Sequence, residues 1–292
     1  MRSWVVAAAV AAVLAGAAVL YGPPGSAEQD DAPARRQAPA HAAAGQPRAE
    51  QAARTRPRRA RVWRPRTDAA RAYARRRGDG VSFAVRRGRR GWSFRGRAPA
   101  PSASTVKALL LAAYLRSPGV RVRALGAGEA ATLRAMITRS DNDAATAIHA
   151  VVGGGGLAAV ARRAGMHDFA AAPAWGASRL TAADGARLML RFERLVPRRH
   201  RARALALLAR VVPEQRWGVA DAAPRGWRLH FKGGWVPATA DTPAVNHQLA
   251  LLRRGRRRVA LAILTSGQAS QARTSETLRG VAARLLRGLG RR

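Results

Sequence analysis

The sequence has 292 residues, enough for one large domain or two small ones, and 48% of them are hydrophobic. It contains no cysteine, which excludes a disulfide, a thiol nucleophile and a cysteine-based metal site. The formal net charge is +37, a balance typical of nucleic-acid-binding proteins. Because no nucleic-acid-binding motif is present and aromatic residues make up only 5%, we interpret the charge as an arginine-rich coding bias and expect no nucleic acid partner.

The first 66 residues are expected to lie outside the folded domain. Residues 1–27 resemble a signal peptide or membrane anchor, with Arg2 before the apolar stretch Trp4–Leu20. Residues 28–66 are rich in Ala, Pro, Gln and Arg without an apolar period, which predicts a disordered linker. We therefore expect an exported protein, either secreted or tethered to the outer face of the cytoplasmic membrane.

The folded domain is expected over residues 67–292. Its beginning predicts a helix over 67–77, then a hairpin with strands at 81–85 and from 92 onward. Prolines at 99 and 101 break the chain before a long apolar helix.

No convincing strand is found between residues 125 and 210. The helices predicted there cover 129–138, 144–152, 157–164, 181–195 and 201–211. Strands then return at 227–232, 244–252 and 257–265, and a helix over 272–289 ends the chain. This order predicts an α+β fold with one antiparallel five-stranded sheet, N- and C-terminal helices packed on it, and an inserted all-α part over about 117–212. A site is expected in the cleft between these parts.

Ser104 and Lys107 lie at the start of the apolar helix. Positions three apart share one helix face, so the lysine amine can act as the base that a serine nucleophile needs. Of the 53 Lys and Arg residues only Lys107 and Lys232 are lysines. Arginine keeps its proton and cannot act as a base, so a titratable amine is retained at just these two positions.

Two more short motifs follow Ser104-x-x-Lys107 along the chain. Ser140-Asp141-Asn142 lies between two predicted helices, and Lys232-Gly233-Gly234 is expected to end a strand. Together the three motifs resemble those of the class A β-lactamases and the related penicillin-binding proteins, over about residues 67–290. The resemblance implies a β-lactamase/transpeptidase-like fold and a serine hydrolase that cleaves β-lactam or amide bonds without a metal or an organic cofactor.

The resemblance also implies three catalytic roles. Ser104 would attack the carbonyl and become acylated, and Lys107 would accept or relay its proton. Ser140 would pass a proton to the leaving nitrogen. Asp141 would hold the loop in place.

The substrate-binding residues implied in the same way are Asn142, Lys232, Gly234 and Trp235. Asn142 would hold a substrate amide and fix Lys107, whereas Lys232 would attract the substrate carboxylate and lower the pKa of Lys107. Gly234 would let the substrate lie against the strand edge. The backbone N–H groups of Ser104 and Trp235 would form the oxyanion hole.

Two departures from the family pattern affect the expected activity. Gly233 stands where the family has Thr or Ser, which removes one hydrogen bond to a substrate carboxylate. The loop over about 168–180 lacks the glutamate that activates the deacylating water, and we expect its only carboxylate, Asp168, to lie at the surface with His167. The resemblance therefore predicts acylation at Ser104 with weak or slow deacylation.

Three functions stay open at this point. The first is an exported serine hydrolase acting on β-lactams, and the second is a peptidase or esterase acting on D-Ala-D-Ala ends. The third is a non-catalytic envelope-binding homologue, which the missing glutamate and hydroxyl favour and the retained motif residues oppose. We expect a monomer whose partner is a small-molecule or peptide substrate, and binding to an anionic envelope polymer is left open. The six histidines are scattered along the chain and predict no zinc site.

Overall fold

The computed structural model describes residues 62–78, 80–239 and 244–290. The predicted signal or anchor and residues 28–61 of the predicted linker lie outside the described residues. The unit that carries the described elements begins at Trp63, four residues before the predicted start. Trp63 explains the earlier start, because its indole Nε1 donates a hydrogen bond to the Arg287 carbonyl at 3.0 Å.

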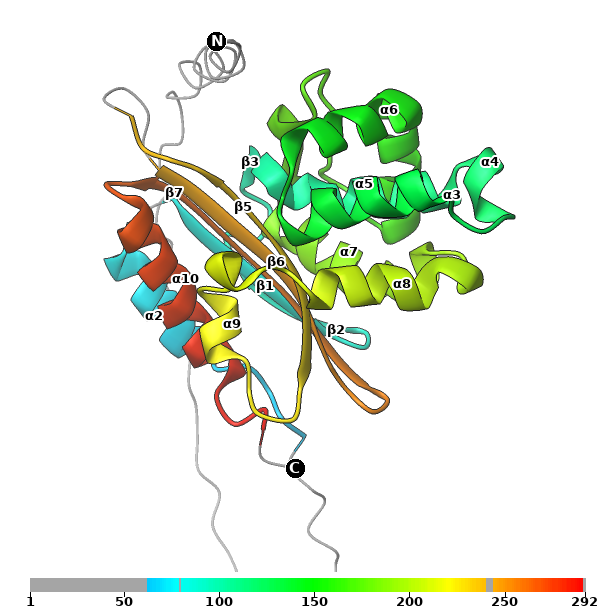
Figure 1. Ribbon diagram of the computed structural model, residues 1–292. Helices are drawn as coiled ribbons and strands as arrows, with labels where there is room; N and C mark the ends of the chain where they lie inside the picture. The colour runs from blue at the N-terminus through cyan, green and yellow to red at the C-terminus, as the bar shows by residue number, and fades with distance from the viewer. Residues whose placement is uncertain (1–61, 79, 240–243, 291–292) are drawn as a thin grey trace, which may run out of the picture. The chain divides into compact units, whose positions relative to one another are not determined.

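Five strands form one antiparallel sheet in the order β2-β1-β7-β6-β5 (Figure 1). Their bounds are β1 Val81–Arg87, β2 Arg90–Phe94, β5 Arg228–Val236, β6 Ala244–Arg254 and β7 Arg257–Gln268. The N-terminal hairpin joins the C-terminal strands through β1 and β7, where Val81 pairs with Thr265. The predicted α+β fold is therefore confirmed, and β5 lies at one edge of the sheet.

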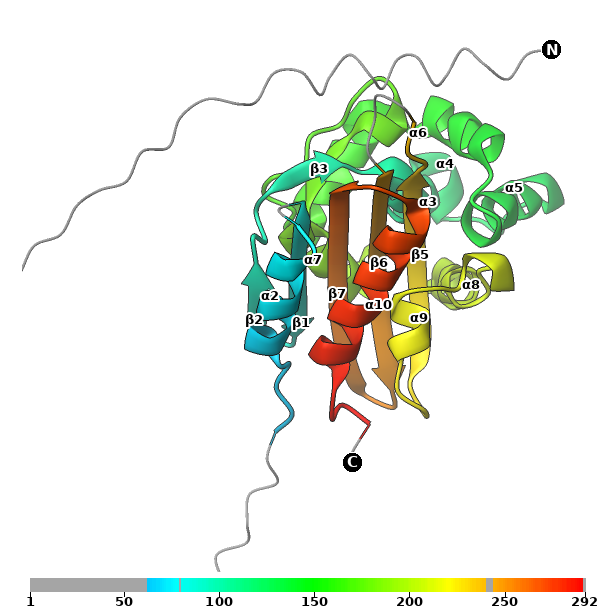
Figure 2. The same cartoon turned by 90° about the vertical axis from the view of Figure 1, so that its left-hand side faces the viewer.

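The terminal helices and one short helix cover one face of the sheet (Figure 2). They are α2 Thr67–Arg76, α9 Val219–Ala222 and α10 Gln271–Leu286. Their buried side chains share a core with Phe83, Phe231 and Ile263 of the sheet. Helices α2 and α10 lie close together because Gly280 faces the Tyr73 ring, where an added Cβ would come within 2.3 Å of ring atoms.

The opposite face carries the inserted helices. They are η2 Ala103–Val106, α3 Lys107–Arg116, α4 Pro118–Arg121, α5 Ala127–Thr138, α6 Asn142–Ala164, η3 Trp175–Ala177, α7 Ala182–Leu195, α8 Arg198–Ala209 and η4 Pro213–Gln215. Helix α3 is buried from Lys107 to Leu115, so it forms the centre of this part. Helix α7 packs directly on the sheet through Gly185, where a Cβ would lie 2.4 Å from the Leu249 side chain.

The insertion agrees with the prediction in one place and differs from it in another. The two helices predicted over 144–152 and 157–164 are the two halves of α6, which are joined across a kink at Gly153 (φ 65°, ψ 171°). By length and composition α6 could also cross a membrane, but a core helix meets the same test. The expectation of no strand between 125 and 210 was wrong, because β4 (Arg179–Thr181) pairs with β3 (Pro99–Pro101). Three-residue strands are too short to show an alternating pattern.

The third motif also lies differently from the prediction. Strand β5 continues to Val236, so Lys232-Gly233-Gly234 lies within the strand and does not end it. Its neighbour β6 pairs with the whole stretch, placing Gly233 opposite Gln248 and Trp235 opposite Asn246. The continuation of β5 could not be predicted from the sequence, because Gly233 and Gly234 weaken a strand pattern.

Candidate active site

Ser104 lies in the 3₁₀ turn that leads into the central helix α3. The Lys107 N–H donates to the Ser104 carbonyl, so the two residues are one turn apart on a continuous helical path. The preceding residue, Ala103, has a φ of 45°, a conformation that costs energy in a non-glycine residue. Among the described residues no group hydrogen-bonds to the Ser104 hydroxyl, and the residue is partly exposed. A hydroxyl in this state is free to turn toward a bound molecule.

Lys107 is fully buried, and its amine is held from one side by the second motif. Its Nζ donates to the Ser140 carbonyl at 2.6 Å, to Asn142 Oδ1 at 2.7 Å and to Ser140 Oγ at 3.3 Å. Burial lowers the pKa of Lys107 to about 7, and the negative charge of Asp141 opposes this shift. Near neutral pH about half of the amine is therefore unprotonated and able to accept a proton.

Ser140 lies between α5 and α6 with a φ of 60°, in the left-handed region. This backbone conformation presents both its carbonyl and its hydroxyl to the Lys107 amine. The next residue, Asp141, caps α6 by accepting a hydrogen bond from the Ala144 N–H at 2.8 Å. Strain at a polar residue that a helix cap holds in place is typical of functional sites.

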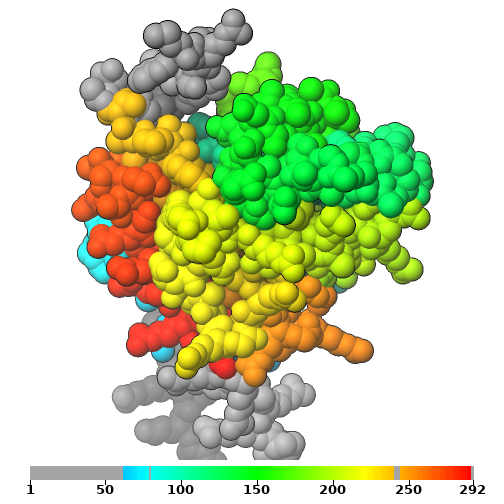
Figure 3. All heavy atoms as spheres, viewed as in Figure 1, coloured from blue at the N-terminus to red at the C-terminus, as the bar shows by residue number. Residues whose placement is uncertain are grey.

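Lys232 reaches the same hydroxyl from the sheet. Its Nζ donates to Ser140 Oγ at 2.9 Å and to the Gly233 carbonyl at 2.7 Å. Burial and then the charge of Lys107 hold the pKa of Lys232 well below its usual value. The resemblance implied that Lys232 lowers the pKa of Lys107, but burial is what lowers the pKa of Lys107 in the structure. The Ser140–Lys232 contact joins the loop between α5 and α6 to β5, and the green and yellow parts of the surface border each other in Figure 3.

The strand that carries Lys232 also lies against the nucleophile turn. A Cβ on Gly234 would come within 2.6 Å of the backbone nitrogens of Ser104 and Thr105. The glycine therefore lets β5 pack against η2, a reason different from the substrate access that the sequence suggested. At Gly233 an added Cβ would meet nothing closer than 3.9 Å, so the missing hydroxyl residue is not excluded by space.

The loop in which the family glutamate was expected presents an aromatic ring instead. The centre of the Trp175 ring lies 4.7 Å from Lys107 Nζ, and the indole Nε1 donates to Thr146 Oγ1 at 3.2 Å. The loop is fixed on its other side by Ser102, whose N–H donates to the Ser178 carbonyl at 2.7 Å. Sequence reasoning missed Trp175 because it examined this loop for carboxylates only.

The carboxylates near this loop are engaged elsewhere. Asp168 pairs with Arg97 at 2.6 Å and His167 is exposed, as expected for surface residues. Asp184 is buried and accepts the backbone N–H groups of His167 and Asp168 at 2.9 and 3.1 Å, which anchors the loop to α7. Within the described residues no carboxylate hydrogen-bonds to Lys107, Lys232 or Ser140.

Two further groups lie at the site, and of their residues only Trp235 was predicted from the sequence. Trp217 and Trp235 pack edge to face with ring centres 5.1 Å apart, and Trp235 lies 5.9 Å from Lys232 Nζ. His247 is buried beneath η2, where Nδ1 accepts the Thr265 N–H and Nε2 donates to the Pro101 carbonyl. Burial lowers the pKa of His247 to about 4, so it is a neutral support of the nucleophile turn. No signal in a single sequence links Trp217 or His247 to the motifs.

The structure thus brings Lys107, Ser140, Asn142 and Lys232 into one hydrogen-bonded network. It places Ser104 beside this network through the backbone contacts of Gly234 and the shared turn with Lys107. In the described ranges no group of three or more His, Asp or Glu could hold a metal ion. Two buried amines around a serine hydroxyl, next to an unpaired serine, can move protons during acyl transfer.

Known proteins were compared with the chain. A family model described as the Beta-lactamase enzyme family matches residues 129–289, more than half of the chain, which includes Ser140, Asn142 and Lys232 but not Ser104 or Lys107. No curated protein gives a significant sequence match.

Many solved structures resemble the fold. A β-lactamase from Sphaerobacter thermophilus aligns with a TM-score of 0.65 and 19% identity over 78% of this chain and 97% of that one. A class A β-lactamase representative from Bacteroides cellulosilyticus aligns with a TM-score of 0.67 and 12% identity, over 79% of this chain and 100% of that one. PBP-A aligns with a TM-score of 0.64 and 18% identity, over 78% of this chain and 98% of that one. At these identities the likeness shows the fold.

Proposed function

We propose, from the premise that this chain belongs to the β-lactamase enzyme family, that Ser104 is the nucleophile of this serine hydrolase and that its acyl-enzyme is released slowly. The observation that carries the proposal is the network in which Lys107 and Lys232 share the Ser140 hydroxyl. A structural ion-pair network would contain a carboxylate, whereas this one holds two amines and a hydroxyl. Such a group is suited to proton transfer.

Acylation follows from this arrangement. Neutral Lys107 accepts the Ser104 hydroxyl proton as Oγ bonds to the substrate carbonyl carbon. When the C–N bond breaks, the Ser140 hydroxyl gives its proton to the leaving nitrogen and regains one from Lys107. The proton lost by Ser104 thus ends on the product amine. The N–H groups of Ser104 and Trp235 would stabilise the oxyanion, a contribution of about 10²–10³ in rate for each donor.

Slow deacylation follows from the Trp175 ring. A deacylating water needs a base within hydrogen-bond reach, and the carboxylate that would supply it is replaced by an indole over Lys107. Lys107 is then the base available to such a water.

The substrate is an amide of the β-lactam type or a D-Ala-D-Ala-terminated wall peptide. The amine of Lys232 and the position of β5 as an edge strand favour an extended substrate with a terminal carboxylate. The missing glutamate favours the peptide, because a peptidase of this fold does not need rapid hydrolysis of a lactam-derived acyl group. Both substrates lie outside the cytoplasmic membrane, and the proposed signal or anchor at residues 1–27 would place the enzyme there.

The test is acylation of the full chain. Incubation with a fluorescent penicillin should give a one-to-one covalent adduct by intact mass, and Ser104→Ala should give none. Nitrocefin turnover and release of D-alanine from a D-Ala-D-Ala peptide then distinguish the two substrates. No adduct with any penicillin, together with no turnover of either substrate, would leave the non-catalytic envelope-binding homologue and overturn the proposal. Export is tested by the N-terminal sequence of the protein recovered outside the cells.

A further inference from the structure

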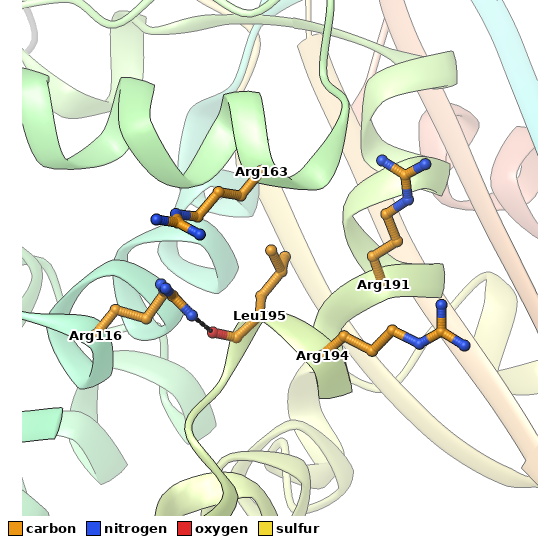
Figure 4. A pocket seen from close by; sticks show the side chains of 5 residues that line it. All are labelled: Arg116, Arg163, Arg191, Arg194 and Leu195. Atoms are coloured by element: carbon orange, nitrogen blue, oxygen red, sulfur yellow. Dashed lines mark hydrogen bonds between the residues drawn. The ribbon is translucent and has the colours of Figure 1, made fainter. Parts of the chain in front are cut away.

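A cavity of about 360 Å³ lies among the inserted helices, in a place that the hydrolase chemistry does not use. Its lining residues are Arg116, Arg163, Arg191, Arg194 and Leu195. They come from the end of α3, the end of α6 and the last turns of α7 (Figure 4). The volume is within the range of small-ligand sites, about 300–1,000 Å³, but such sites are mostly apolar whereas this one has four guanidinium groups.

Two of the four arginines are held in place by backbone carbonyls, and none of the four takes part in an ion pair among the described residues. Arg116 is partly buried and donates to the Leu195 carbonyl at 2.9 Å, and Arg191 donates to the Ala164 carbonyl at 3.0 Å. In the part of the chain that the structure describes, no carboxylate pairs with any of the four. The nearby acid Glu193 is committed to Arg253 and Arg258 on the other side of α7.

Two of the guanidinium groups face each other. Figure 4 shows Arg116 and Arg163 pointing toward one another, while Arg191 and Arg194 extend on the far side of the Leu195 side chain. Like charges this close repel, and the charge of Arg163 contributes with burial to lowering the pKa of Arg116. An anion between the two would remove the repulsion and would meet two planar forks of N–H donors.

We propose that this cavity binds a phosphate-bearing ligand, with the phosphate held between Arg116 and Arg163. Guanidinium forks match phosphate oxygens with two parallel hydrogen bonds. A terminal phosphate carries about −1.5 to −2 charges near pH 7, which suits two cations better than a single carboxylate does. Arg191 and Arg194 add positive potential at the rim, so a second phosphate should strengthen binding. The site is independent of the Ser104 chemistry.

The probe is inorganic pyrophosphate, with inorganic phosphate and sodium acetate beside it, titrated calorimetrically into the full chain at constant ionic strength. Arg163→Gln is the test variant, because Arg163 is exposed and has no hydrogen bond or ion pair among the described contacts, so its loss should not affect folding. Arg225→Gln, an exposed arginine in the turn before β5, is the matched control for net charge. Arg116→Gln is a second test variant, to be used with its melting temperature checked first.

The proposal expects pyrophosphate to bind more tightly than phosphate and phosphate more tightly than acetate. Arg163→Gln should weaken pyrophosphate binding at least about tenfold, as for the loss of a charged hydrogen bond, and Arg225→Gln should change it less than about twofold. No pyrophosphate binding, or equal weakening by the two variants, would overturn it, because the attraction would then come from net charge alone.

A second measurement distinguishes a lipid headgroup from a soluble phosphate compound as the ligand. Flotation is compared on phosphatidylcholine vesicles that contain either phosphatidic acid or phosphatidylglycerol at matched surface charge. Preferential retention by phosphatidic acid that Arg163→Gln abolishes assigns a lipid headgroup as the ligand. Pyrophosphate binding without that preference assigns a soluble phosphate.

Discussion

Titration of Lys107 should control the rate at which Ser104 is acylated. With the pKa lowered by burial to about 7, about half of the amine is neutral at pH 7. A lysine with the ordinary value of 10.5 would be neutral in only about 0.03% of molecules, so burial increases the neutral fraction by about 10³. The acylation rate should therefore fall about tenfold per pH unit below pH 6 and level off above pH 8, reaching about 1% of its plateau at pH 5.

The measurement is the rate of fluorescent-penicillin labelling from pH 5 to pH 9 at constant ionic strength, with circular dichroism at each pH to confirm folding. Lys107→Arg keeps the charge but cannot lose its proton, so labelling should drop by at least about 10³ at every pH. A rate independent of pH between 5 and 8, or a limb that rises only near pH 10, would refute the assignment of Lys107 as the base.

Four other outcomes are expected. Trp175→Glu should shorten the half-life of the acyl-enzyme at least about tenfold by supplying a base for water, whereas Trp175→Gln should not, as followed by loss of the adduct by mass. Gly233→Thr should raise kcat/KM for acylation by a carboxylate-bearing penicillin about tenfold through one charged hydrogen bond, and Gly233→Val, which lacks the hydroxyl, should not. Gly234→Ala should cost about 1–3 kcal/mol of unfolding free energy in urea, because its Cβ would meet the backbone of Ser104. The free energy of unfolding should rise with pH between about 7 and 10.5, where the unfolded chain binds the proton that folded Lys107 has lost, and this slope should be smaller in Lys107→Met.

The elements that the sequence predicts well are those with a long periodic or continuous apolar pattern. Helices α2, α5, α7 and α10 and all five strands of the sheet were expected within a few residues of their bounds. The elements that were missed are short or contain breaking residues. Strand β3 has two prolines in three residues, and β5 continues through two glycines, so tertiary pairing decides their structure and local propensity does not.

The site residues also fall into a group that could be predicted from the sequence and a group that could not. Ser140, Asn142 and Lys232 could be assigned from the resemblance of three short motifs to those of a known family. The structure connects Ser140 and Asn142 to Lys107 with hydrogen bonds, and Lys232 to Ser140. Their roles in the reaction are still predictions. Trp175 could not be assigned, because its effect depends on how a loop without regular secondary structure folds over the amine.

The choice of lysine at two positions connects the composition to the chemistry. Of the 53 basic residues only two are lysines, and these two are the amines that the structure buries around the Ser140 hydroxyl. An arginine in either place would bring a permanent charge into a site where burial lowers the pKa of both lysines and the charge of Lys107 lowers the pKa of Lys232 further. Arginine is tolerated at surface positions, where its charge stays hydrated. At the two buried positions the chain instead has lysine, whose amine can lose its proton. The two lysines are therefore the positions where this chain places a buried amine whose pKa is lowered, in contrast to the permanently charged arginines elsewhere.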